Sequence, residues 1–156
     1  MVIAARLIDL DRAREAVSTV VDPEIPVLTI AELGILRDVV VDEGQVVVTI
    51  TPTYSGCPAM SQIEDDVRDR LVASGFERVV VKITHTPVWS TDWIGPGARA
   101  KLAAFGIAPP TADADVLCPR CAASVPRMVS TFGSTACKAL MVCIQCGEPF
   151  DWFKEF

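Results

Sequence analysis

The sequence predicts two domains: an α+β domain in which helices pack on a small sheet, and a C-terminal ribbon built around cysteines. Segments with helical periodicity alternate with β-branched runs through the first part of the chain. Five of the six cysteines follow later, behind a stretch that contains two adjacent prolines. We therefore place the α+β domain at residues 1–107, a linker at 108–115 and the ribbon domain at 116–156.

The core-facing residues of the first two predicted helices recur at three- and four-residue steps. They are Leu10, Ala13, Val17 and Val20 in the first helix, and Ile63, Val67 and Leu71 in the second. We expect Asp22-Pro23 to end the first helix, because the residue before a proline avoids the helical conformation. Pro58 suits the start of the second helix. A third helix is predicted at Ala98–Phe105, before Gly106.

Three β-branched runs predict the sheet of this domain. They are Val39–Val41, Val46–Ile50 and Val79–Ile83. The segment 42–44 ends in a glycine and is expected to form a tight hairpin turn between the first two runs. We expect all three strands in one sheet, with the helices packed against it.

Composition narrows the classes of function. The 156 residues include 20 acidic and 14 basic ones, for a net charge of −6 and a pI near 4.7. An acidic chain is a poor candidate for sequence-independent binding to nucleic acid, which needs clustered Lys and Arg. No run approaches the roughly 20 apolar residues of a membrane helix, and the first residues do not resemble a signal peptide. We expect a cytoplasmic protein with reduced cysteines, bound to neither membrane nor nucleic acid.

Four cysteines of the tail have the spacing of a metal site. Cys118 and Cys121 form one C-x-x-C knuckle, and Cys143 and Cys146 form a second one, with 21 residues between the two knuckles. The two thiolates of a knuckle can reach one ion, and two knuckles complete the tetrahedron that zinc prefers. We therefore predict a zinc ribbon, with iron or an iron–sulfur cluster as the alternative occupant. Such a closed site stabilises a fold and leaves no open position for catalysis.

Cys137 lies between the knuckles but outside their spacing. We interpret it as a small buried residue of the ribbon, and a supporting role as a metal ligand is the alternative.

The loop Thr51–Pro58 carries the remaining cysteine, Cys57. It runs from the end of a strand to the start of a helix, so Cys57 should lie at or next to the N-cap. The helix dipole there favours a thiolate, which can bind a soft metal or attack an electrophile. The alternative is a buried cysteine beside an anion-binding turn. Asp22 and Glu24, from a stiff proline-flanked loop, could support a site at Cys57 or could simply form a rigid turn.

A tryptophan-rich segment follows the third strand. Trp89, Asp92 and Trp93 could form a surface for a partner protein. The tryptophans could equally fold back and cover the small core. His85 is the only histidine of the chain, and we interpret it as structural or solvated.

Several motifs resemble known families. The segments 22–26, 32–35 and 51–58 resemble the assembly-type domain of iron–sulfur maturation proteins. With four further segments the whole chain resembles the PaaD family: 89–93, 106–110, 132–139 and 148–154. This family is the D component of the phenylacetyl-CoA epoxygenase system. It is also called the J component of phenylacetate-CoA oxygenase. In this resemblance the motif cysteine of the assembly domain corresponds to Cys57, and the tail knuckles correspond to the cysteines of its zinc ribbon.

The resemblance implies an accessory protein of phenylacetate degradation, in the system whose monooxygenase converts phenylacetyl-CoA to a ring epoxide. It would assist maturation of an iron or iron–sulfur centre of that complex, with a transient iron or cluster at Cys57. Its partners would be other epoxygenase subunits and iron–sulfur assembly proteins, and self-association stays open. The alternatives are a structural adaptor that docks epoxygenase subunits without metal delivery, and a thiol enzyme.

The residues themselves agree that the chain does not catalyse the oxygenation. It contains neither the paired Glu-x-x-His motifs of di-iron bundles nor the Gly-rich fingerprint of nucleotide-cofactor domains. We therefore assign no catalytic residue.

Overall fold

The computed structural model describes residues 2–112, 115–124 and 126–156, and it divides into two compact units, Met1–Trp89 and Ser90–Phe156. The elements of the first unit are α1 (Val2–Ser18), β1 (Leu36–Asp42), β2 (Gln45–Ile50), α2 (Ala59–Ala73) and β3 (Arg78–Ile83). Those of the second are the 3₁₀ turn η1 (Thr91–Trp93), α3 (Pro96–Phe105), β4 (Ile107–Ala108), β5 (Pro126–Ser130), β6 (Lys138–Cys143) and β7 (Pro149–Phe153).

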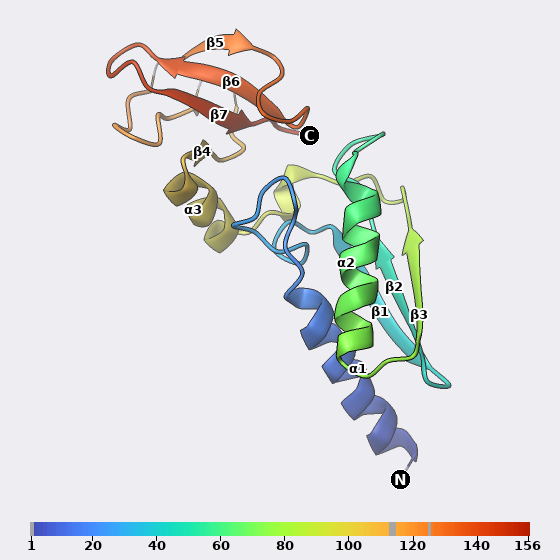
Figure 1. Cartoon of the computed structure of the whole chain (residues 1–156). Helices are drawn as coiled ribbons and strands as arrows, with labels where there is room; N and C mark the ends of the chain where they lie inside the picture. Colours follow the sequence, from blue (N-terminus) through green and yellow to red (C-terminus); the bar gives the residue numbers. More distant parts are fainter. Residues whose placement is uncertain (1, 113–114, 125) are drawn as a thin grey trace. The chain divides into compact units, whose positions relative to one another are not determined.

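The three predicted strands form one sheet, which confirms that prediction, and their order in it is β1-β2-β3 (Figure 1). β1 and β2 are antiparallel, and Glu43 and Gly44 have positive φ angles of 47° and 75° in the turn between them. β3 pairs with β2 in parallel after the crossover through α2. Both helices lie on the same face of the sheet, and α1 also contacts α2 (Figure 1).

The core of the first unit lies between these helices and the sheet. Val46, Val48 and Ile50 of β2 face it, and Ile63, Val67 and Leu71 of α2 are fully buried. In the first helix Ala13 and Val17 are buried, whereas Leu10 is only half-buried. The predicted helices are therefore confirmed, and Leu10 is the one member of the predicted core that is not fully covered.

The first helix ends earlier than expected. α1 ends at Ser18, before the pair Asp22-Pro23 that was expected to end it. The Thr19 hydroxyl donates to the carbonyl of Ala16 (2.7 Å), and Val21 pairs with Thr29 in an isolated bridge, so the chain has already left the helix.

An irregular segment between α1 and β1 contributes much of the core. Its buried apolar side chains are Ile25, Leu28, Ile30, Leu33 and Ile35. Within it, Thr29 and Glu32 cap each other: the backbone N–H of Thr29 donates to the Glu32 carboxylate (3.0 Å), and the N–H of Glu32 donates to the Thr29 hydroxyl (3.1 Å). This reciprocal pair stabilises a turn that periodicity alone does not predict.

The second unit is a four-stranded sheet of order β4-β7-β6-β5, preceded by α3. Its core cluster joins residues of the sheet to both predicted knuckles: Ala108, Val116, Cys118, Ala139, Met141, Cys143, Phe150 and Trp152. The ribbon prediction is thus confirmed as a fold.

The division between the units differs from the boundary expected after residue 107. α3 belongs to the second unit, and β4 pairs with β7 inside the ribbon sheet. The Arg99 side chain ties the segment together by donating to the carbonyls of Ile94 (2.9 Å), Thr91 (2.9 Å) and Pro110. The expected linker therefore begins inside a strand, and its residues 113 and 114 lie outside the described part of the chain.

Candidate functional site

The four tail cysteines converge in the structure. The Sγ atoms of Cys118, Cys121, Cys143 and Cys146 all lie within 4.8 Å of one another. Two of these separations are 3.8 Å, between Cys118 and Cys146, and 3.6 Å, between Cys121 and Cys143. Sulfurs placed tetrahedrally at about 2.3 Å from one ion are about 3.8 Å apart. The donor set and its spacing therefore fit a four-coordinate thiophilic metal.

The two knuckles share one backbone geometry. The N–H of Ala122 donates to the carbonyl of Cys118 (2.8 Å), and the N–H of Gly147 donates to that of Cys143 (2.9 Å). Ala122 and Gly147 both have positive φ angles, 59° and 76°. This turn presents both sulfurs of each knuckle on one side, and within each pair the first cysteine is buried and the second exposed.

The crowding of thiols changes their acidity. A backbone hydrogen bond from Cys146 lowers the pKa of the Cys143 thiol from 9.0 to about 7, and burial opposes this only in part. For Cys121, the backbone hydrogen bond with Ala123 favours the thiolate, but desolvation and hydrogen bonds with the other three thiols outweigh it and raise the pKa to about 12. Four thiolates therefore repel one another unless a cation lies between them.

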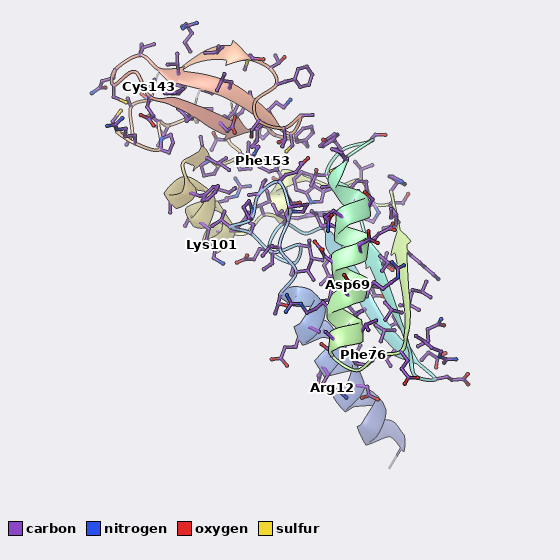
Figure 2. The ribbon with its side chains drawn as sticks, viewed as in Figure 1. Arg12, Asp69, Phe76, Lys101, Cys143 and Phe153 are labelled. Atoms are coloured by element: carbon purple, nitrogen blue, oxygen red, sulfur yellow. The ribbon has the colours of Figure 1, made fainter. Side chains whose placement is uncertain are left out.

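Cys137 does not join this cluster. Its side chain is 3% exposed, and its Sγ lies 3.0 Å from the Thr135 hydroxyl. It directly precedes β6, whereas Cys143 ends that strand, so the two are about 20 Å apart along the sheet. Phe153, which pairs with Lys138 in the ladder, lies at the other end of this sheet from Cys143 (Figure 2). Cys137 is a core residue of the ribbon and supplies no ligand to the tail cluster.

The Cys57 loop has the predicted place between strand and helix. β2 ends at Ile50, Pro58 is the N-cap residue of α2, and Cys57 directly precedes it. Gly56 has a φ of 82°, and the N–H of Cys57 donates to the carbonyl of Tyr54 (3.3 Å). The Cys57 side chain is half-buried. The sulfur is thus partly accessible at the N-terminal end of a helix whose N-cap residue makes no side-chain cap.

The acidic loop forms a rigid turn. Asp22 is 5% exposed, and its Oδ1 accepts the N–H groups of Glu24 and Ile25, both at 2.8 Å. The carboxylate of Asp22 is therefore committed to holding this turn, as in an Asx-turn. That Asp22 or Glu24 supports a site at Cys57 stays a prediction.

The structure corrects one residue of the expected partner surface. Trp89 is 3% exposed, and its Nε1 donates to the carbonyl of Leu33 (2.8 Å). Trp89 therefore covers the core of the first unit, which was the alternative interpretation. Asp92 is exposed and Trp93 half-buried in η1 of the second unit, so these two stay candidates for a surface contact.

A cleft that sequence reasoning missed lies beside the Cys57 loop. It has a volume of about 450 Å³ and is lined by residues 51–55 together with His85, Val88 and Trp89. Thr51 is 1% exposed, and its hydroxyl has no hydrogen-bond partner among the described residues. A signal for this cleft exists in the sequence: residue 51 follows β2 and residue 85 follows β3, and the carboxyl ends of parallel strands meet at one edge of a sheet.

Comparison with known proteins now places the chain. Residues 10–84 match the family described as "Iron-sulfur cluster assembly protein", and residues 106–154 match the "PaaD zinc beta ribbon domain". A protein of Escherichia coli (strain K12), named as the D component of a putative 1,2-phenylacetyl-CoA epoxidase, is 47% identical over 145 residues, covering 88% of this chain and 87% of that one. The chain belongs to the PaaD family of phenylacetyl-CoA epoxidase components.

Two further relatives each match part of this PaaD family member. An Fe-S protein maturation auxiliary factor of Porphyromonas gingivalis (strain ATCC BAA-308 / W83) is 38% identical over 86 residues, 54% of this chain and 81% of its own. The crystal structure of a DUF59 domain from Bacillus anthracis is 28% identical, with a TM-score of 0.59 over 64% of this chain and 96% of that one. The predicted iron–sulfur-assembly-type fold is thereby confirmed. No helix in the described part of the chain is long and apolar enough to cross a membrane.

Proposed function

We propose that the chain is an accessory protein of a phenylacetyl-CoA epoxidase system that assists maturation of an iron or iron–sulfur centre of that complex. The observation that carries this proposal is the half-buried Cys57 directly before the cap of α2, in a unit that matches the iron–sulfur cluster assembly family. A thiol at a helix N-terminus can bind a soft metal ion. The iron or cluster is cargo here, and the acceptor is another component of the complex.

A single thiolate suits transient binding. One protein ligand leaves the other positions on the iron to the donor or the acceptor, so the cargo can be passed on. The partial exposure of Cys57 gives a partner access to the sulfur. The loop Thr51–Pro58 holds the thiol through the Cys57–Tyr54 backbone hydrogen bond, so its position does not depend on the cargo.

In this proposal the tail cluster has a separate role: it holds one zinc ion through Cys118, Cys121, Cys143 and Cys146. The Sγ separations of 3.6 and 3.8 Å support a tetrahedral ion of this size. Zinc in a closed four-thiolate site would supply folding energy to the ribbon. Metal analysis of the purified chain tests this assignment: one zinc per chain supports it, and iron with visible absorption would replace it.

The experiment for Cys57 compares epoxidase assembled beside the wild-type chain or its variants. With Cys57→Ala we expect an unchanged melting curve and tail metal content, but an epoxidase deficient in iron. Ser55→Ala is the matched control, because Ser55 is an exposed residue of the same loop. A fully metallated, active epoxidase beside Cys57→Ala would refute delivery through this thiol.

The structure lacks one feature that favoured the alternative function, a structural adaptor. It relied on an exposed tryptophan surface, and Trp89 is buried in the core. An adaptor would also be insensitive to the Cys57 substitution, so the same experiment separates the two functions.

A further inference from the structure

The sheet of the first unit has one face that neither of this unit's two helices covers. α1 and α2 both pack on the other face, where β2 places the buried residues Val46, Val48 and Ile50 (Figure 1). Side chains alternate between faces along a strand, so the intervening residues point to the open face. Val40 shows the result, since 46% of its surface is exposed.

The strand register arranges the open face into three rows. The rows, written from β1 through β2 to β3, are Asp38–Thr49–Lys82, Val40–Val47–Val80 and Asp42–Gln45–Arg78. The middle row is entirely apolar. The two outer rows each begin with an acidic residue on β1 and end with a basic residue on β3. Within these rows the charged residues of β1 are therefore acidic and those of β3 are basic, whereas Arg37 lies at the bulge of β1, outside the rows.

We propose that this open face is the contact surface of a symmetric dimer of the chain. A two-fold axis that lies between two such faces and runs parallel to the strands places β1 of each copy over β3 of the other, and β2 over β2. Each row then meets the same row of the second copy. Asp38 faces Lys82, Asp42 faces Arg78, and the valine row packs on itself.

The charges also select this arrangement over the other two-fold alternative. An axis across the strands would place β1 over β1 and exchange the outer rows, so that Asp38 would face Asp42 and Lys82 would face Arg78. Like charges at such contacts disfavour association. Sheets that pack face to face cross at about 30°. This angle is small enough for the rows to remain opposite one another.

The dimer would place both Cys57 loops at one end. Rotation about an axis parallel to the strands preserves strand direction, so β2 of each copy ends at the same side. Since the loop Thr51–Pro58 follows β2, the two copies would present their thiols to one acceptor surface. This consequence rests on the proposed function, whereas the dimer itself does not.

The face is small, so we expect a weak, reversible dimer. Stable interfaces bury about 800 Å² per partner, and nine positions on three short strands provide less. Sedimentation of the full chain across a concentration series should show a monomer–dimer equilibrium. Val40→Lys should raise the dissociation constant at least tenfold. Val72→Lys is the matched control, because Val72 is 56% exposed on α2 and should leave the equilibrium unchanged.

A charge exchange tests the orientation. Asp38→Lys and Lys82→Asp should each weaken self-association, because each creates like-charge contacts across the axis. An equimolar mixture of the two variants should restore dimerisation, because every introduced charge then faces its opposite. Circular dichroism and melting curves of each variant check that the fold is intact.

Three results would overturn the proposal. A wild-type chain that sediments as a monomer at about 1 mM, the weak end of the affinity scale, has no such dimer. A dimer that Val40→Lys leaves intact uses another surface. Variants that fail to recover when mixed do not meet in the proposed register. Loss of the dimer with normal epoxidase maturation would leave the proposed function standing, so the two can fail independently.

Discussion

The ribbon contains a buried ion pair whose two members should respond unequally to substitution. Lys138 Nζ lies 3.8 Å from Asp151 Oδ2, and the side chains are 4% and 19% exposed. Asp151 has additional partners, because it accepts hydrogen bonds from the hydroxyl (2.6 Å) and the N–H (3.3 Å) of Ser134. Lys138 is therefore the member that depends on its partner.

The expected losses of stability follow from the burial of these two side chains. Asp151→Asn keeps the shape but leaves the Lys138 ammonium buried without a counter-charge. Breaking a buried pair in this way costs about 3–5 kcal/mol. Lys138→Met replaces the buried stem with an apolar chain of similar length and leaves Asp151 with Ser134 and partial access to water. That change should cost about 1 kcal/mol.

The assay is hydrogen exchange of the backbone amides of β6, which reports the opening of the ribbon alone. Ser134→Ala is a control that removes one exposed donor and should cost little. We expect a loss of protection at least tenfold larger for Asp151→Asn than for Lys138→Met, since about 1.4 kcal/mol corresponds to a factor of ten. Equal losses, or a larger loss for Lys138→Met, would refute the reasoning from burial.

Three other predictions test packing and the metal site. Gly133→Ala should destabilise the ribbon, because the new Cβ would lie 2.2 Å from Asp151 Oδ1, whereas Gly97→Ala in α3 meets no atom within 4 Å and should stabilise the chain by about 0.4–1 kcal/mol in a thermal melt. Trp89→Phe should lower the free energy of unfolding of the first unit by about 1–3 kcal/mol, because the carbonyl of Leu33 loses its donor; an unchanged urea midpoint would contradict this. Cys143→Ser should weaken metal binding and unfold the ribbon, whereas Cys137→Ser should keep the metal; a Cys143→Ser chain that stays folded and holds its metal ion as tightly as the wild type would exclude the four-thiolate site.

The sequence by itself determined the features that depend on neighbours along the chain. A two-residue spacer brings two thiols to one side of a turn whatever surrounds it, so the knuckles at Cys118 and Cys143 were predictable from spacing alone. The same holds for the glycine-containing hairpin turn after Asp42. The place of Cys57 before a helix also follows locally, because Pro58 favours a helix start and the β-branched run ends at Ile50.

Only the tertiary structure decided which surfaces are covered. The pattern around Trp89 fits an exposed loop as well as a core residue, and its burial depends on the carbonyl of Leu33, 56 residues away in sequence. Residues Ile25 to Ile35 form much of the core without any period, so periodicity could not identify them. From the sequence alone a lysine such as Lys138 is expected at the surface. It is buried in the structure because Asp151 compensates its charge.

The division of the chain into two units and the cleft beside the Cys57 loop both result from strand pairing between distant segments. α3 has a helical sequence, but its membership of the second unit is set by the pairing of β4 with β7 at the far end of the chain. Likewise, Thr51 and His85 reach one cleft only because β2 and β3 are parallel neighbours. Local conformation is set by short-range sterics and hydrogen bonds, whereas burial is set by pairings between distant segments, which one sequence does not specify.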